Sequence, residues 1–122
     1  MSDDGSRGTA GEDRACQHLR RQGFAILERN YRCRTGEIDV VARDGDTLVF
    51  VEVKERGDRS HGGAVEAVTG SKRRRVIRAA QHWAAVHQES ESRVRFDVVA
   101  IDHGPEGTTI RHERGAFDSE GR

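Results

Sequence analysis

Three residues near the middle of the chain have the types and the spacing of a site that could hydrolyse a phosphodiester bond. Glu52 and Lys54 lie two positions apart in a strand-like run, so both side chains point to one face of the strand. Val51 and Val53 point to the opposite face. The site gains a third member if Asp39, in the preceding strand-like run, points to the same face as Glu52.

The turn between the two strand-like runs, residues 36–43 and 47–54, decides whether Asp39 joins the site. A two-residue turn at Gly45-Asp46 suits a type II′ hairpin and places Asp39 opposite Glu52. Side chains in such a pair have Cβ atoms roughly 4.5–5.5 Å apart. A turn one residue earlier makes Asp39 a diagonal neighbour of Glu52 on the same face. Both registers predict two carboxylates and an ammonium group in one place.

Neighbouring carboxylates repel each other, and a hard divalent cation such as Mg²⁺ would neutralise both through oxygen ligands. Such a cation polarises a phosphoryl oxygen and lowers the pKa of a bound water. Lys54 could orient that water or offset developing negative charge. The plainer alternative is an exposed, polar strand end at Glu52 and Lys54, with Asp39 in a cross-strand charge pair.

Glu12 is an acid with two interpretations. It shares a helical face with Ala15, Cys16 and Leu19, so its carboxylate could be a further ligand of a metal or a water. It also lies three residues after Thr9, in the pattern of a capping box at the start of a helix. Spacing alone leaves both interpretations open.

Five basic residues crowd the start of the second predicted helix: Lys72, Arg73, Arg74, Arg75 and Arg78. Cations at this end oppose the helix dipole and cost stability. The cluster is either a solvated helix face or a nucleic-acid-binding patch that contacts phosphates, to which Arg56 and Arg59 could add. We favour the patch. The histidines show no zinc-ligand spacing, and Asp97 is interpreted as a polar strand position that faces a helix cap or solvent.

Periodicity and turn residues predict a mixed β-sheet flanked by helices, in the order α-β-β-β-α-β-β. The expected helices are residues 9–22 and a second helix that begins at 69 or 71 and ends at 87. The expected strands are residues 25–33, 36–43, 47–54, 94–101 and 108–112. Residues 55–68 are predicted to form a loop. We expect a disordered N-terminus at 1–7, a single domain at 8–117 and a frayed tail at 118–122.

The composition limits the classes of function. The 122 residues are 34% hydrophobic and 34% charged, with 21 basic and 21 acidic residues, so any nucleic-acid binding must come from local patterning. No apolar run has the length of a transmembrane helix, and the N-terminus lacks a signal-peptide layout. Two cysteines without a metal-ligand spacing suggest thiols in a reducing compartment. We therefore expect a cytoplasmic protein without a membrane partner.

The chain resembles the YraN family of small bacterial proteins, which is related to archaeal Holliday junction resolvases and other PD-(D/E)xK nucleases. The resemblance covers about residues 8–117. Its carriers are Gly11-Glu12 with Ala15 and Leu19, Asn30-Tyr31-Arg32, Gly36-Glu37-Ile38-Asp39, Val49–Lys54, Glu66-Ala67-Val68, Lys72-Arg73-Arg74 and Arg95–Val98. The resemblance implies a restriction-endonuclease-like (PD-(D/E)xK) core.

By this resemblance Asp39 and Glu52 are the metal-binding acids, with the Val53 carbonyl as a further ligand and Lys54 as the catalytic lysine. Glu12 matches the acid that the resolvases place on their first helix, which makes it a further catalytic and metal-binding candidate. Two positions depart from the pattern. Ile38 occupies the position of the proline in the PD-(D/E)xK motif. Glu55 stands where related sequences often have a small polar residue, and this extra acid beside the site could alter metal affinity.

We therefore expect a Mg²⁺- or Mn²⁺-dependent endodeoxyribonuclease or nucleic-acid-processing protein, acting on branched or single-stranded DNA. The resolvases cut as two-fold dimers, so the resemblance also suggests a homodimer, although no feature of the sequence shows one. One alternative is a binding module that holds nucleic acid on a nuclease scaffold without cutting it. Another is an accessory protein whose basic helix binds an acidic protein partner.

Overall fold

The computed structural model describes residues 10–57 and 68–122. The elements follow in the order α2 (Ala10–Arg21), β1 (Ala25–Cys33), β2 (Gly36–Asp44), β3 (Thr47–Arg56), α3 (Gly70–Val86), β4 (Arg93–Gly104) and β5 (Gly107–Phe117). This confirms the predicted order of helices and strands. The last strand is longer than the residues 108–112 that the sequence suggested, because β5 pairs with β4 as far as Phe117.

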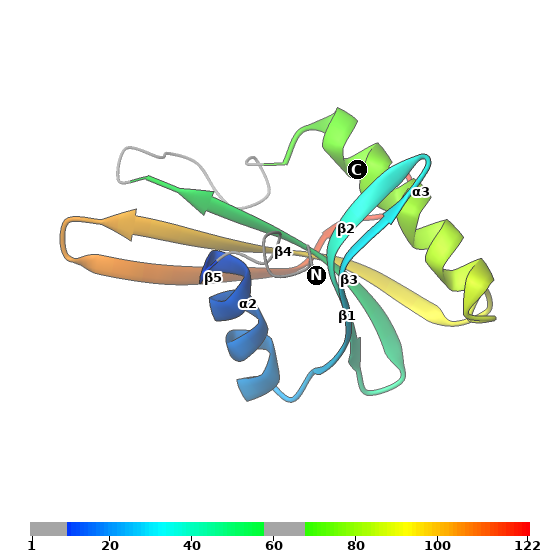
Figure 1. The fold of residues 1–122 in the computed structure, drawn as a ribbon, viewed down its shortest axis with the longest axis horizontal. Coiled ribbons are helices and arrows are strands. Elements are labelled where there is room, and N and C mark those ends of the chain that lie inside the picture. The colour runs from blue at the N-terminus through cyan, green and yellow to red at the C-terminus, as the bar shows by residue number, and fades with distance from the viewer. Residues whose placement is uncertain (1–9, 58–67) are drawn as a thin grey trace, which may run out of the picture.

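One mixed sheet contains all five of the described strands, in the order β1-β2-β3-β4-β5 (Figure 1). Neighbouring strands are antiparallel except for β3 and β4, which run parallel and are connected through α3. A parallel pair needs a crossover connection of this kind. The central strand β3 is therefore joined to β2 by a tight turn and to β4 by a helix.

Side-chain alternation along the strands builds a separate apolar core on each face of the sheet. On one face, Leu48 and Phe50 pack with α3 in a cluster that includes Val76 and Trp83. On the other face, Val49 and its neighbours pack with α2 in a second cluster. The members of that second cluster are Ala15, Cys16, Leu19, Phe24, Val40, Ala42, Val49, Val51, Val99 and Ile101. In the described part of the chain, α3 thus covers one face of the sheet and α2 covers the other.

Both helices end or begin at residues suited to that position. Gly23 follows α2 with a φ of 94°, and the Phe24 amide donates to the Leu19 carbonyl at 3.0 Å. A glycine in the left-handed region is a common end of a helix. At the start of α3, the Thr69 Oγ1 accepts a hydrogen bond from the Lys72 amide at 3.2 Å. This N-cap fixes where the first turn of α3 begins, and with it the position of Lys72.

Gly36 lets α3 lie unusually close to the start of β2. A Cβ atom at this position would overlap the backbone carbonyl oxygen of Arg75. The residue is buried, and only a glycine leaves room for the helix backbone there. This contact holds the first turns of α3 against the end of β2 that carries Asp39.

Some expectations fall outside or at the edge of the described residues. The N-terminus at 1–7 and most of the predicted loop, residues 58–67, lie outside them. Residues 118–122, expected to fray, contain no helix or strand, but Asp118 accepts from two backbone amides and Gly121 from the Arg73 side chain. Among the described helices, none has the length and apolarity needed to cross a membrane.

Candidate functional site

The predicted site lies where β2 and β3 separate. Their ladder runs from the Asp44–Thr47 pair to the Val40–Val51 pair, which confirms the two-residue turn at Gly45-Asp46. Asp39 is the first residue beyond the paired segment. Its Oδ2 accepts a hydrogen bond from the Val53 amide at 2.8 Å, so a side chain continues the contact between the strands. Asp39 is therefore fixed by the backbone of the strand that carries Glu52.

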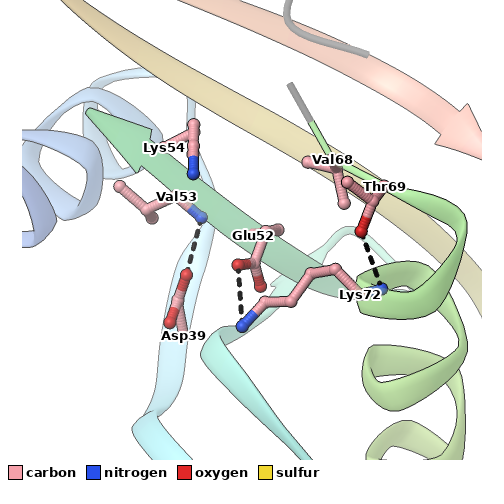
Figure 2. A pocket seen from close by; sticks show the side chains of 7 residues that line it. All are labelled: Asp39, Glu52, Val53, Lys54, Val68, Thr69 and Lys72. Atoms are coloured by element: carbon pink, nitrogen blue, oxygen red, sulfur yellow. Dashed lines mark hydrogen bonds and ion pairs between the residues drawn. The ribbon is translucent and has the colours of Figure 1, made fainter. Parts of the chain in front are cut away.

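Glu52 is a buried acid with one satisfied and one unsatisfied oxygen. Its side chain lies on the α3 face of β3, and the residue is only 5% exposed. Glu52 Oε2 lies 3.4 Å from the ammonium nitrogen of Lys72, whereas Oε1 is buried without a hydrogen-bond partner among the described residues. Figure 2 shows Asp39, Glu52 and Lys72 pointing toward one another between β2, β3 and the first turn of α3.

Burial and mutual repulsion make the two carboxylates reluctant to ionise. Burial and then the charge of Asp39 raise the pKa of Glu52 to about 8, against an ordinary value of 4.5. Burial likewise raises the pKa of Asp39, although the Val53 amide and the Lys72 charge lower it in part. The pair therefore carries less than its full negative charge at neutral pH unless more positive charge reaches it.

Lys72 belongs to this site, although the sequence suggested that it contacts phosphate. Its ammonium nitrogen lies 3.3 Å from Glu37 Oε2 as well as 3.4 Å from Glu52. The prediction for Lys72 is revised for a physical reason: the first turn of α3 faces the site, so the side chain runs inward between two acids. Sequence reasoning missed Glu37. Strand alternation could have found it, because Glu37 lies two residues before Asp39.

Lys54 is the exposed member of the site. It lies on the same strand as Glu52 and lines a hollow of about 460 Å³ together with Asp39 and Lys72. Among the described residues, Lys54 forms no ion pair, so its ammonium group can approach a ligand in the hollow. The chain's two lysines are Lys54 and Lys72, so all the other basic residues are arginines and both lysines line this one hollow.

Glu12 lies beside the site on the α2 side of the sheet. Its Oε1 accepts hydrogen bonds from Arg29 at 3.2 Å and from Asn30 at 3.1 Å, and the residue is 6% exposed. Burial raises the pKa of Glu12, and the charge of Asp39 adds to that rise. Thr9, the other half of the predicted capping box, lies outside the described residues. The carboxylate of Glu12 thus senses Asp39 electrostatically and is held by β1.

The three acids do not form a single ligand cluster. In the described part of the chain, no group of three or more His, Cys, Asp or Glu side chains lies close enough together to hold a metal ion. The Asp39–Glu52 pair is therefore the part of the predicted set that comes together, and a metal role for Glu12 stays a prediction. Val53 lines the hollow, and its carbonyl as a ligand also stays a prediction.

The remaining basic residues of α3 divide between packing and exposure. Arg73 donates to the carbonyl oxygens of Val68 and Gly121, and its guanidinium lies over the Phe117 ring. Arg75 lies 3.6 Å from Glu37 Oε1. Arg74 and Arg78 are exposed. The predicted five-residue patch is thus reduced to an exposed part, because Lys72 and Arg73 turn inward. Arg56 lies at the end of β3 rather than in the predicted loop and pairs with Asp102, and Arg59 lies outside the described residues.

The residues present fit a divalent cation. Carboxylate oxygens are the ligands that Mg²⁺ and Mn²⁺ prefer, and Asp39 and Glu52 supply them from two strands held in a fixed relation. The Glu52 Oε1 atom is a buried acceptor that lacks a donor, which is costly unless a ligand or cation satisfies it. A bound cation would also lower the raised pKa values of both acids, since a nearby positive charge favours their ionised forms.

Asp97, the third strongly buried acid, is satisfied by hydrogen bonds from within the fold. It is fully buried, and it accepts hydrogen bonds from Arg95, His112 and the Gly115 amide. The interpretation as a position facing a helix cap or solvent was wrong. The longer β5 strand brings His112 and Gly115 over Asp97, and residues beyond 112 were not recognised as strand.

Comparison with known proteins places the chain in a family. Residues 11–101 match the model of the uncharacterised protein family UPF0102. The chain belongs to the UPF0102 family. UPF0102 is the YraN family, so the resemblance noted in the sequence is confirmed.

The relatives in UPF0102 cover most of this chain. A UPF0102 protein of Frankia alni is 50% identical over 111 residues, which are 90% of this chain and 92% of the relative. One from Anaeromyxobacter dehalogenans is 47% identical over 115 residues, or 94% and 86% of the two chains. One from Herminiimonas arsenicoxydans is 53% identical over 95 residues, or 78% and 76%. The described site residues all fall within residues 11–101, the region that the family model matches.

Proposed function

We propose that this chain is a metal-dependent endonuclease with a restriction-endonuclease-like core, which hydrolyses phosphodiester bonds in nucleic acid. Branched or single-stranded DNA is the substrate class that we expect. The observation that carries the proposal is the buried Glu52 carboxylate, with one oxygen unsatisfied, beside Asp39 at the edge of an open hollow. A buried carboxylate with an unsatisfied oxygen destabilises the folded state, and a bound cation would offset that destabilisation.

The arrangement of elements supports the proposed core. The two acids come from adjacent antiparallel strands, and the helix that follows the second strand supplies a cation to the same place. The exposed lysine two residues after Glu52 fits the pattern that the family resemblance implies. Fold alone does not fix activity, so the proposal rests on the site and not on the sheet.

Each side chain has a distinct role in this proposal. Asp39 and Glu52 would hold Mg²⁺ or Mn²⁺, which when bound supplies Lewis-acid polarisation of a phosphoryl oxygen and a more acidic water. The Val53 amide keeps the Asp39 carboxylate in place. Lys54 would contact a phosphoryl oxygen and offset its negative charge. Exposed Arg74 and Arg78 would contact flanking phosphates.

One observation favours a second candidate, a nucleic-acid-binding module that does not cut. The ammonium group of Lys72 already lies on Glu52, so part of the negative charge that would attract a cation is offset. A module of this kind would bind nucleic acid through Lys54, Arg74 and Arg78 with a steep salt dependence. It would need neither Asp39 nor a metal.

The decisive experiment measures cleavage of labelled four-way junction, flap, duplex and single-stranded DNA with Mg²⁺, Mn²⁺ or chelator. We expect metal-dependent cutting that Asp39→Asn reduces by roughly 100-fold, because the substitution replaces a charged metal ligand with a neutral one. Lys54→Met should reduce cutting while leaving metal binding intact. Asp46→Asn is the matched control, since Asp46 is an exposed aspartate at the hairpin turn.

The outcomes separate the candidates. Cutting that Asp39→Asn abolishes and Asp46→Asn preserves, with unchanged thermal unfolding, establishes the nuclease. Cutting that survives Asp39→Asn would overturn the assignment of this site. Salt-sensitive DNA binding without cutting on any substrate would favour the binding module, and the absence of both would point to an acidic protein partner.

A further inference from the structure

Lys72 is held by two acids at once. Its ammonium nitrogen lies 3.3 Å from Glu37 Oε2 and 3.4 Å from Glu52 Oε2, and its side chain is 29% exposed. The Thr69 cap and the close packing of α3 at Gly36 fix the backbone from which it reaches. The ammonium group therefore sits between two alternative carboxylates and is not bound to one alone.

The position of Lys72 is not explained by the helix that carries it. A cation in the first turn of a helix opposes the helix dipole, and the first turn of α3 contains no acidic residue to compensate. The favourable interactions of Lys72 come instead from β2 and β3. The side chain is thus placed for the site, at some cost to the helix.

The acids around Lys72 differ in how many cations they have nearby. Glu37 has Lys72 and Arg75, whereas Glu52 has Lys72 alone among the described residues. If Lys72 stays with Glu37, Asp39 and Glu52 can carry two negative charges between them, which a single Mg²⁺ or Mn²⁺ would neutralise. Glu37 has a second cation nearby, since the Arg75 guanidinium lies 3.6 Å from its Oε1, whereas Glu52 Oε1 has no partner among the described residues.

We infer that Lys72 is a built-in counter-cation that competes with a divalent metal ion for Glu52, and that Glu37 is the acid that retains Lys72 when the metal binds. The inference rests on the proposed metal site and adds how its affinity is set. In the metal-free protein Lys72 limits the cost of the buried Glu52 carboxylate. When a metal ion arrives, Lys72 gives up Glu52 and keeps its ion pair with Glu37, so no buried charge is left alone.

The first test measures Mn²⁺ affinity by isothermal titration calorimetry, without nucleic acid. Lys72→Met removes the competing charge, so we expect Mn²⁺ to bind roughly tenfold more tightly, given the strength of a charge interaction at this distance. Lys54→Met is the matched control, because it removes the other lysine of the hollow without touching Glu52, and it should change affinity much less. If Lys72→Met does not fold, Lys72→Gln replaces it.

The second test asks whether Glu37 acts through Lys72. Glu37→Gln leaves Lys72 with Glu52 as its remaining carboxylate, so we expect Mn²⁺ affinity to fall several-fold. In the Lys72→Met background the same substitution should have a smaller effect, since no ammonium group then needs to be retained. Equal effects in both backgrounds would show that Glu37 acts by its charge alone and would overturn its assigned role.

A third test follows the side chain itself in the wild-type protein. With two lysines in the chain, lysine labelled with ¹³C at Cε gives two resolvable ε-methylene environments, which Lys54→Arg assigns. Adding Mg²⁺ should shift the Lys72 signal as its contact with Glu52 is lost. A Lys72 signal that does not move at saturating Mg²⁺ would overturn the exchange.

The measured outcomes distinguish a failure of this inference from a failure of the proposed function. Wild-type cleavage and Asp39-dependent Mn²⁺ binding, with affinity unchanged or weakened in Lys72→Met, would overturn the inference and leave the nuclease standing. Tightened Mn²⁺ binding in Lys72→Met without DNA cleavage would support the inference and overturn the nuclease. Absence of Mn²⁺ binding in every variant would overturn both.

Discussion

The fold buries two acids on neighbouring strands, and it treats them in opposite ways. Asp97 on β4 is fully buried and receives hydrogen bonds from Arg95, His112 and Gly115. Glu52 on β3 is nearly as buried, yet one of its oxygens has no donor among the residues described. Burial raises the pKa of both, but only at Asp97 do the hydrogen bonds from His112 and Arg95 overcome it and lower the pKa below its ordinary value.

The difference separates an acid whose oxygens are satisfied within the fold from one that keeps an unsatisfied oxygen. Asp97 lies under a paired strand, where β5 closes over it and its bulge directs the Gly115 amide toward the carboxylate. Glu52 lies where β2 has separated from β3, so no further strand supplies donors. Unsatisfied buried acids are rare because they are costly, and their occurrence in an open hollow suggests a ligand.

The comparison first predicts that removing Asp97 is severely destabilising. Asp97→Ala would leave Arg95 and the Gly115 amide without their buried acceptor, and we expect a loss of about 3–5 kcal/mol in the free energy of unfolding. Urea denaturation measures it, with exposed Asp46→Ala as a control expected to stay within about 0.5 kcal/mol. A loss below 1 kcal/mol for Asp97→Ala would remove the contrast between the two acids.

Removing the charge of Glu52 should raise the free energy of unfolding, which is the opposite of the effect expected for Asp97→Ala. Because the pKa of Glu52 is raised to about 8, its contribution to stability is fully present below pH 4.5 and is lost as the pH rises through about 8. Glu52→Gln avoids this loss, and after allowing for the weakened Lys72 contact we expect a gain of about 1–2 kcal/mol at pH 7 in chelator.

The pH profile sharpens this prediction. The difference in unfolding free energy between Glu52→Gln and the wild-type protein should grow from pH 5 to pH 8, as measured by urea denaturation at each pH. Asp46→Asn is the matched control, because Asp46 is exposed at the turn. A Glu52→Gln protein that is less stable than the wild type throughout this range would mean that Lys72 already satisfies the site.

Much of the fold follows from local sequence signals. The Gly45-Asp46 turn predicts the register of β2 with β3, because two-residue turns leave little freedom in how the strands pair. Gly23 and Thr69 mark helix ends through backbone geometry and capping, which depend on neighbouring residues alone. The sequence predicts a shorter β5, because the pairing of the residues beyond His112 depends on contacts with β4.

The site was only partly predictable, because its members differ in what positions them. Asp39 and Glu52 follow from strand alternation and a short turn. The inward direction of Lys72 depends on how closely α3 packs at Gly36, and a basic run gives no sign of that packing. Its partner Glu37 gains significance only once Lys72 is placed. Tertiary contacts therefore decide which residue of a charged cluster enters the site.

Glu12 shares one feature with Asp97 and another with Glu52, so it tests how far the contrast between those two acids extends. Arg29 and Asn30 donate to its carboxylate, as donors do at Asp97, yet burial still raises its pKa, as at Glu52. Glu12→Gln keeps an oxygen acceptor for both donors and removes the charge, so we expect the unfolding free energy at pH 7 to change by less than about 1 kcal/mol.

Asp13→Asn is the matched control for Glu12→Gln, because exposed Asp13 also binds Arg29, at 2.8 Å. Its effect should stay within about 0.5 kcal/mol, as surface ion pairs contribute little. A loss for Glu12→Gln as large as that for Asp97→Ala would make Glu12 a structural acid. A gain as large as that for Glu52→Gln would instead group Glu12 with Asp39 and Glu52, since only an acid held at the site against its own desolvation is relieved by losing its charge.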